Sequence, residues 1–178
     1  MKISTVPPVE KWLGDSFNVK QIQKINIDDL LGRDTIELNK EKIANQLQNK
    51  IILVSGAAGS IGSEICRQVL HYGPKKLILL DQAESGLYDL EHEFKKNDFK
   101  QNWEIVIGDI INYVRMERLF SHFKPDLIFH AAAYKHVPLM ELNPAEAITT
   151  NVEGSKNLIK LSDKYNAVKF VLISTDKA

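Results

Sequence analysis

The chain has 178 residues, and its 23 Lys and Arg balance its 23 Asp and Glu to a formal net charge of zero. That balance excludes a polycationic surface for nucleic acid or acidic lipid, and no run of about 18 apolar residues exists that would span a bilayer. Cys66 is the only cysteine, which excludes an internal disulfide and a multi-cysteine metal site, and we expect no metal. We expect Cys66 to be a small buried apolar side chain.

The chain divides into an irregular arm and a regular domain. Residues 1–50 contain Pro7-Pro8 and scattered apolar residues, so they predict an N-terminal arm or linker with helical turns near 27–31 and 39–49. From residue 51 onward, apolar segments predict strands at 51–55, 76–81, 103–107, 126–130 and 169–174. The segments between them predict helices at 60–72, 84–96, 113–122 and 144–165.

Nearly continuous apolar strands that alternate with helices indicate a parallel sheet covered on both faces. The sequence therefore predicts a doubly wound, Rossmann-type α/β domain over residues 51–178, with strand order 3-2-1-4-5. Ligands of such open sheets bind at the carboxyl ends of the strands. The residues that follow each strand are therefore the candidates for a site.

A glycine-rich segment directly follows the first predicted strand. Gly56, Gly59 and Gly62 have the spacing G-x-x-G-x-x-G, which is typical of a turn that binds the pyrophosphate of a dinucleotide. Gly56 permits the tight turn, Gly59 lets the backbone approach the phosphates, and Gly62 lets helix and strand pack closely. Ser60 and Ile61 open the next helix, whose free N–H groups would face the phosphates. The alternative is an ordinary glycine-rich turn.

Acidic residues follow the next two strands. Asp81 would accept hydrogen bonds from the adenine-side ribose, and a 2′-phosphate there would meet a like charge, at a cost on the order of 1–4 kcal/mol at ~4 Å. NAD is therefore favoured over NADP. Asp109 would accept from the adenine amino group, with Ile110 packed on the ring. The alternatives are that Asp81 only caps the next helix and that Gly108-Asp109 is an ordinary turn.

The spacing Y-x-x-x-K, typical of the catalytic pair of short-chain dehydrogenases, occurs twice, as Tyr72…Lys76 and Tyr165…Lys169. Each pair joins the end of a predicted helix to the start of the next strand. That places both pairs at the amino edge of the sheet, opposite the glycine-rich turn, and we reject them as catalytic residues.

Polar residues also follow the fourth and fifth strands. After His130, the small side chains of 131–133 would leave room for a nicotinamide or ribose, and Lys135 and His136 would hold a substrate. Thr175, Asp176 and Lys177 near the end of the chain put a hydroxyl, an acid and a base side by side, which suits proton transfer. Each segment taken alone also fits a packing or capping loop.

These segments resemble the extended short-chain dehydrogenase/reductase superfamily and, within it, the nucleotide-sugar 4,6-dehydratases of bacterial polysaccharide biosynthesis. The match is narrowest to the membrane-anchored UDP-N-acetylglucosamine 4,6-dehydratase branch, of the capsular polysaccharide biosynthesis type. It rests on residues 55–64, 130–141 and 174–178, on Asn151 with Gly154, and on 29–33 in the arm. It covers the chain from about residue 27 to the end.

The resemblance implies a role for each matching residue. The residues that would bind NAD are Gly56, Gly59, Ser60, Ile61, Gly62, Asp81, Asp109, Ile110, Ala131, Ala132 and Lys135. Lys135 and His136 would contact the sugar nucleotide, and Asn151 would brace the strand edges. In the catalytic cluster of Thr175, Asp176 and Lys177, Lys177 would take the C5 proton after hydride transfer from C4. Asp176 would protonate the departing C6 hydroxyl, and return of the hydride to C6 would give a 4-keto-6-deoxy sugar.

The family's later Tyr- or Met-containing Lys segment, its substrate domain and its N-terminal membrane segments do not occur in this sequence. We therefore expect a truncated part of a larger lyase, which binds NAD weakly and turns over no sugar nucleotide. The expected partner is a nucleotide sugar, and we expect no nucleic acid and no direct membrane contact. The sequence leaves open whether the chain forms a homo-oligomer. The expected location is the cytoplasm, in a parent that can be anchored to the inner membrane. The alternatives are a sugar-nucleotide 4-epimerase or reductase and a non-catalytic NAD-binding regulatory module.

Overall fold

The computed structural model describes residues 4–5, 23–24, 39–97 and 102–174. It divides the chain into two units, Met1–Asn39 and Lys40–Ala178. In the first unit, strands β1 (Ser4–Thr5) and β2 (Gln23–Lys24) pair antiparallel. Helix α2 (Lys40–Leu47) lies in the second unit, where Leu47 is buried in the core. The division therefore falls before α2, whereas the sequence assigned residues 1–50 to the arm.

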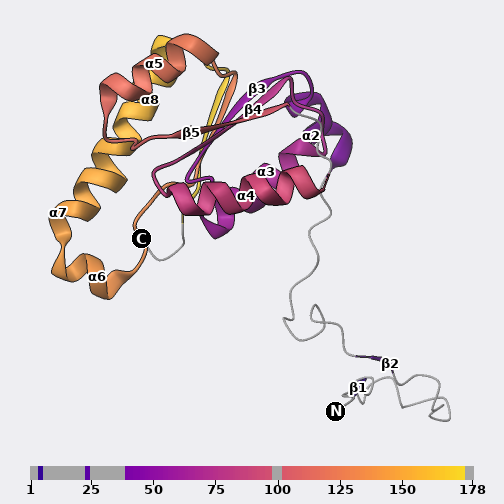
Figure 1. The fold of residues 1–178 in the computed structure, drawn as a ribbon, viewed down its shortest axis with the longest axis horizontal. Coiled ribbons are helices and arrows are strands. Elements are labelled where there is room, and N and C mark those ends of the chain that lie inside the picture. Colours follow the sequence, from indigo (N-terminus) through magenta and orange to yellow (C-terminus); the bar gives the residue numbers. More distant parts are fainter. Residues whose placement is uncertain (1–3, 6–22, 25–38, 98–101, 175–178) are drawn as a thin grey trace, which may run out of the picture. The chain divides into compact units, whose positions relative to one another are not determined.

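Five parallel strands form the sheet of the second unit, in the order β5-β4-β3-β6-β7 (Figure 1). They are β3 (Ile51–Ser55), β4 (Lys76–Asp81), β5 (Trp103–Ile107), β6 (Leu127–His130) and β7 (Lys169–Leu172). Counted within this sheet, the order is 3-2-1-4-5, so the predicted strand order and the doubly wound α/β fold are confirmed.

Helices connect the strands on both faces of the sheet. They are α3 (Ser60–Leu70), α4 (Glu84–Lys96), α5 (Tyr113–Phe123), α6 (Val137–Leu142), α7 (Pro144–Ala147), the π-helix η3 (Ile148–Gly154) and α8 (Ser155–Lys164). The predicted single helix over 144–165 is thus α7, η3 and α8 in succession. Helix α6 lies in a segment for which no helix was predicted.

Two apolar layers separate the helices from the sheet. Because successive strand residues point to opposite faces, Val54 and its neighbour Leu53 belong to different layers. Val54 packs in the layer that contains Phe94 of α4, whereas Leu53 packs in the layer that contains Phe120 of α5. Figure 1 shows α3 and α4 on one side of the sheet and α5 and α8 on the other. Cys66 of α3 is fully buried, as predicted, and burial raises the pKa of its thiol.

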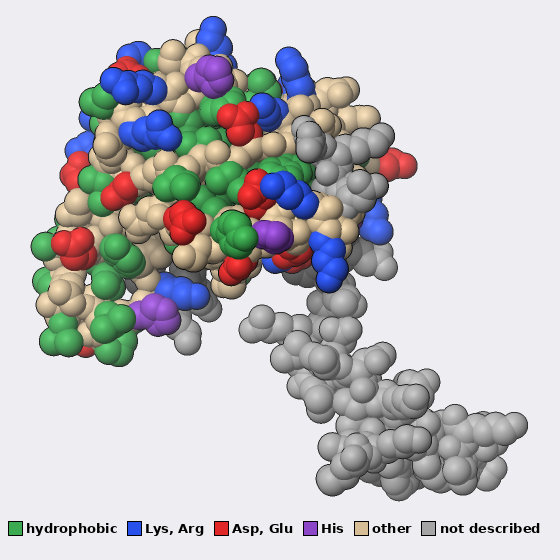
Figure 2. Space-filling model, viewed as in Figure 1, with side chains coloured by type: hydrophobic (Ala, Val, Ile, Leu, Met, Phe, Trp, Pro, Cys, Tyr) green, Lys and Arg blue, Asp and Glu red, His purple; other side chains and the backbone are tan. Residues whose placement is uncertain are grey.

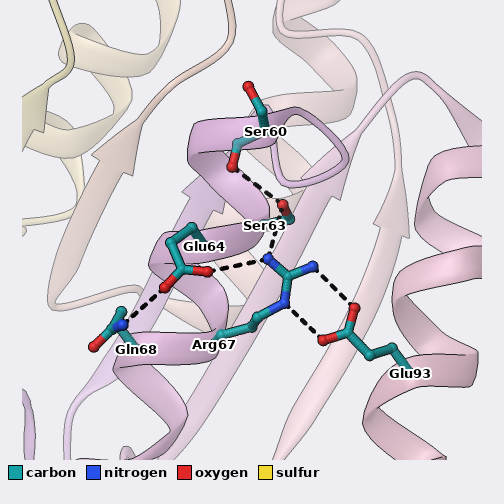
Figure 3. A network of polar contacts seen from close by, with 6 residues as sticks. All are labelled: Ser60, Ser63, Glu64, Arg67, Gln68 and Glu93. Atoms are coloured by element: carbon teal, nitrogen blue, oxygen red, sulfur yellow. Dashed lines mark hydrogen bonds and ion pairs between the residues drawn. The ribbon is translucent and has the colours of Figure 1, made fainter. Parts of the chain in front are cut away.

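An ion pair joins the two helices on one face. The guanidinium of Arg67 in α3 binds the carboxylate of Glu93 in α4 through two parallel contacts, of 2.6 and 2.9 Å (Figure 3). The same guanidinium contacts Glu64 at 3.2 Å, one turn earlier in α3. These hydrogen bonds raise the pKa of Arg67 and lower the pKa of Glu93. The ion pair therefore links the exposed sides of α3 and α4.

Acidic and basic side chains are interspersed on the face drawn in Figure 2, in keeping with the neutral overall charge. Of the helices within the described ranges, none combines the length and the apolar character that a membrane crossing requires.

Candidate functional site

The glycine-rich loop between β3 and α3 crosses very close to the loop after β6. Gly56 has φ +75°, a backbone conformation that favours glycine, and a Cβ there would lie 2.5 Å from the amide nitrogen of Ala132. A Cβ at Gly62 would overlap the carbonyl oxygen of Gly56. A Cβ at Gly59 would meet only that same oxygen, at 3.2 Å, and otherwise face open space. The loop therefore exposes backbone at Gly59, where a ligand can approach.

Asp81 at the end of β4 faces this loop. Its Oδ2 accepts a hydrogen bond from the amide of Ala58 at 2.9 Å, and its Oδ1 accepts from the amide of Ala83 at 2.9 Å. A carboxylate has about four lone-pair sites, so each oxygen can still accept a hydroxyl donor. Asp81 thus holds both the glycine-rich loop and the residue that precedes α4, whose N-cap has no side-chain hydrogen bond, and its role toward a ribose stays a prediction.

The turn after β5 forms the next side of the site. Asp109 accepts from the amide of Ile111 at 2.9 Å through Oδ1, and Ile110 is buried but lines the pocket. Asn157 of α8 donates to the carbonyl oxygen of Ile110 at 3.2 Å. A Cβ at Gly154 would lie 2.6 Å from Ile110 Cδ1, so helix and turn are in close contact.

The loop after β6 is held by Asn151 of the π-helix. Its Oδ1 accepts from the amide of Tyr134 at 2.8 Å, and its Nδ2 donates to the Tyr134 carbonyl oxygen at 2.9 Å. The amide of Ala131 donates to the carbonyl oxygen of Ser55 at 2.9 Å, which joins this loop to the end of β3. The bracing role predicted for Asn151 is consistent with this geometry.

A pocket of about 140 Å³ opens where these four segments meet. Its lining includes the predicted residues Gly56, Gly59, Asp81, Asp109, Ile110, Ala131 and Ala132, and also Leu80, Gln82, Gly108, Ala133, Tyr134 and Thr150. Of the second group, the sequence reasoning named Ala133 among the small side chains of 131–133, and it missed the other five as site residues. Gln82, Gly108 and Tyr134 adjoin predicted residues and could have been found from that position, whereas Thr150 is brought in only by the π-helix.

The other predicted residues lie outside this lining. Ser60, Ile61 and Gly62 form the first turn of α3, and the side chain of Ile61 is 56% exposed. The first amides of a helix lack intrahelical acceptors, so this turn offers donors at the mouth of the pocket. Lys135 and His136 are exposed in the segment that leads into α6. The predicted catalytic residues Thr175, Asp176 and Lys177 lie outside the described residues.

The carboxyl edge of the sheet contains a buried histidine. His130 ends β6, and its ring bonds Ser55 Oγ at 2.7 Å through Nδ1 and Ser155 Oγ at 2.8 Å through Nε2. Ser155 donates its own proton to the carbonyl oxygen of Asn151 at 2.6 Å. Ser155 therefore accepts from Nε2–H, and Ser55 donates to Nδ1. Burial lowers the pKa of His130 to about 4, so the ring is neutral near pH 7.

Both Y-x-x-x-K pairs lie at the opposite edge. Lys76 pairs with Ile51, the first residue of β3, and Lys169 pairs with Leu127, the first residue of β6. Their distance from the pocket along the strands confirms that neither pair belongs to this site. Within the ranges that the structure describes, no group of three or more His, Cys, Asp or Glu side chains could hold a metal ion.

The pocket has the chemical groups expected of part of a dinucleotide site. The first turn of α3 offers N–H groups for a pyrophosphate beside the exposed backbone of Gly59, whose own amide donates to the Gly56 carbonyl oxygen at 3.0 Å. Asp81 and Asp109 offer acceptors on the β4–β5 side. The glycine at 56 and the alanines at 131 and 132 keep the floor free of large side chains.

Comparison with known proteins agrees with this geometry. A family model described as "Polysaccharide biosynthesis protein" matches residues 52–178. The capsular polysaccharide biosynthesis protein CapD of Staphylococcus aureus is 44% identical over 100% of this chain and 30% of its own length. A UDP-N-acetylglucosamine 4,6-dehydratase (inverting) of Campylobacter jejuni is 34% identical over 72% of this chain and 37% of its own length. The chain thus spans about a third of the length of these relatives.

Solved structures with this fold include sugar-nucleotide enzymes. The structure of Pen from Bacillus thuringiensis is 36% identical, with a TM-score of 0.66 over 71% of this chain and 38% of that one. A UDP-glucose 4-epimerase of Thermotoga maritima, crystallised with UDP-glucose, is 33% identical with a TM-score of 0.61 over 70% of this chain and 37% of that one. A UDP-glucose 4-epimerase of Thermus thermophilus, in complex with NAD, is 28% identical with a TM-score of 0.59 over 70% and 37%.

The family match runs from the second residue of β3 past β7 and covers every wall of the pocket. Similar proteins include a dehydratase, an epimerase and a polysaccharide biosynthesis protein. The chain therefore belongs to the polysaccharide biosynthesis protein family of the short-chain dehydrogenase/reductase type.

Proposed function

We propose that the chain is the NAD-binding part of a nucleotide-sugar 4,6-dehydratase that acts on a UDP-N-acetylglucosamine-like substrate in polysaccharide biosynthesis. The observation that carries the cofactor assignment is the pocket in which the ends of β3, β4, β5 and β6 meet. The structural neighbour from Thermus thermophilus, which was crystallised with NAD, supports it.

In this proposal each wall of the pocket holds one part of the cofactor. The amides at the start of α3 bind the pyrophosphate, and Asp81 accepts from the ribose hydroxyls next to adenine. Asp109 accepts from the adenine amino group, beside Ile110. The backbone of Ala131 and Ala132 borders the nicotinamide half. Bound there, NAD supplies a reversible hydride acceptor.

The catalytic residues are proposed from the sequence. Thr175, Asp176 and Lys177 directly follow Ser174 in the chain, and the preceding residue Ile173 donates its amide proton to the carbonyl oxygen of His130 at 2.9 Å. Lys177 would remove the C5 proton of the sugar, and Asp176 would protonate the departing C6 hydroxyl. Lys135 and His136 would contact the nicotinamide side or the sugar nucleotide.

A 4-epimerase is the second candidate, because the Thermotoga maritima neighbour is a UDP-glucose 4-epimerase at 33% identity. The Campylobacter jejuni relative, at 34% identity, favours dehydration. So does the Asp176-Lys177 pair, because epimerisation at C4 needs no acid for a C6 hydroxyl.

The experiment that separates the two uses the whole protein with UDP-N-acetylglucosamine in deuterated water. Dehydration yields a 4-keto-6-deoxy product with deuterium at C5, and Lys177→Ala abolishes it. A C4 epimer without deuterium at C5 would instead establish the epimerase. If the chain is a regulatory module, the whole protein should not turn over the sugar nucleotide, and Lys177→Ala should leave its biological output unchanged. The 178-residue chain itself is expected to bind NAD.

A further inference from the structure

One face of the continuous helix formed by η3 and α8 contacts both loops that border the pocket. Asn151 holds the backbone of Tyr134 through two hydrogen bonds, of 2.8 and 2.9 Å. About one turn later, Gly154 lies against Ile110, and Asn157 donates to the Ile110 carbonyl oxygen. The position of this helix therefore sets the separation of the two loops.

The buried ring of His130 joins this helix to the sheet. Through Ser55 it is bonded to the end of β3, and through Ser155 to the first residue of α8. The hydroxyl of Ser155 continues the chain of bonds to the carbonyl oxygen of Asn151, four residues earlier. Asn151 is the residue that holds Tyr134, so four hydrogen-bonded residues connect the strand ends to the pocket wall.

We propose that His130 is a positioning residue of the dinucleotide site, which acts through Ser155 to hold the π-helical turn at the register that keeps Asn151 on Tyr134. This inference rests on the proposed binding of NAD, and it gives His130 no contact with the cofactor. π-Helical turns are rare and frequently occur at functional sites. Here the turn spans Ile148–Gly154, and the His130–Ser155 bond lies at its end.

The chain offers a matched pair of serines for the test. Ser155→Ala removes the hydroxyl that links His130 to Asn151. Ser162→Ala removes a buried hydroxyl from the same helix, which donates to the carbonyl oxygen of Leu158 at 2.7 Å. Both changes delete one hydroxyl from α8, so a general loss of stability should be similar in both. Ser155→Thr restores the hydroxyl and serves as the rescue variant.

Two measurements decide the outcome. We expect Ser155→Ala to weaken NAD binding, measured by calorimetry, by about fivefold or more, and to speed hydrogen exchange of the Tyr134 amide by a similar factor. Ser162→Ala should change neither by more than about twofold, and Ser155→Thr should restore both. Equal effects of the two Ala variants, or an unchanged Tyr134 amide in Ser155→Ala, would overturn the inference.

The two proposals fail in different ways. If the unaltered chain binds no NAD, the proposed function fails, and the exchange rate of the Tyr134 amide still decides the role of the His130–Ser155 link. A double-variant cycle of His130→Phe with Ser155→Ala provides a second check. If His130 acts through Ser155, the double variant exchanges no faster at Tyr134 than His130→Phe alone, whereas multiplied effects would contradict the link.

Discussion

The Oδ2 atom of Asp81 lies 2.9 Å from the amide nitrogen of Ala58, which joins the end of β4 to the middle of the glycine-rich loop. The residue expected to recognise the ribose therefore also holds the loop expected to recognise the pyrophosphate. Because one carboxylate serves both, a change at Asp81 alters the affinity for the cofactor and the choice between cofactors together.

Asp81→Asn tests this double role. The amide retains one acceptor oxygen for the Ala58 amide but removes the negative charge that would repel a 2′-phosphate. Repulsion of even 1 kcal/mol corresponds to about a fivefold difference in affinity. We expect the ratio of NADP to NAD dissociation constants, measured by fluorescence titration, to fall by about fivefold or more. An unchanged ratio would contradict the assignment of Asp81 to the ribose.

Gly62→Ala and Gly59→Ala should separate packing from ligand binding. A Cβ at position 62 overlaps the Gly56 carbonyl oxygen, and we expect a loss of about 2–3 kcal/mol in the free energy of unfolding. A Cβ at position 59 meets only that oxygen, at a tight 3.2 Å, so Gly59→Ala should cost clearly less stability than Gly62→Ala. It should nevertheless weaken NAD binding about tenfold or more, because the methyl group occupies the approach of the pyrophosphate. Urea unfolding and calorimetry measure the two effects, and equal destabilisation by both variants would refute the distinction.

His130 should make stability depend on pH. Its pKa is lowered from an ordinary 6.5 to about 4. As the pH falls, the unfolded chain is therefore protonated at this ring at a higher pH than the folded chain. Its contribution is complete above pH 6.5, is lost as the pH falls toward 4, and amounts to about 3 kcal/mol. Unfolding in urea across this range measures the slope, which His130→Asn should reduce. Direct titration of the ring by NMR provides a check, and a midpoint near 6.5 in the folded protein would contradict the burial effect.

Local patterns in the sequence predicted most of the fold. The strand limits 51–55, 76–81 and 103–107 and the helix 84–96 agree with the structure, because buried strands and capped helices leave signals within a few residues. Helix α6 was not predicted because it is short and contains Pro138, which usually signals the end of a helix. Proline is nevertheless tolerated in the first turn, where Pro138 lies.

The site was predictable only in part. The glycine spacing, the acidic strand ends and the small side chains after the fourth strand are local signals. Together they identified Gly56, Gly59, Asp81, Asp109, Ile110 and residues 131–133 of the pocket lining. The Asn151–Tyr134 bonds join residues 17 apart, and the Ser55–His130 bond joins residues 75 apart. Such contacts depend on which strands become neighbours and on the π-helical turn, so no spacing in the sequence reveals them.

Cys66 should be chemically inert in the folded chain. Its side chain is fully buried in α3 and burial raises the pKa of its thiol, so very little reactive thiolate is available. Reaction with a thiol reagent, followed by absorbance, should be slow in buffer and complete after unfolding in guanidinium. Rapid reaction in buffer would show that the α3 layer opens readily.

Arg67→Lys should loosen the contact between α3 and α4 only slightly. Lysine cannot form the two parallel bonds to Glu93 shown in Figure 3, but both side chains are about a third exposed, so water screens the pair. We expect a loss of about 0.5–1 kcal/mol in the free energy of unfolding. The Lys95–Glu91 pair, within α4 alone, provides the control: Lys95→Gln should cost less.

The close crossing of Gly56 and Ala132 also limits how this pocket can be redesigned. At Gly56 any side chain would collide with the backbone of Ala132, so substitutions there would mainly yield chains that do not fold. Gln82, Tyr134 and Thr150 also line the pocket and take no part in this crossing of the two backbones. Libraries restricted to these three positions would sample altered ligand preference while leaving the folding determinants of the loop intact.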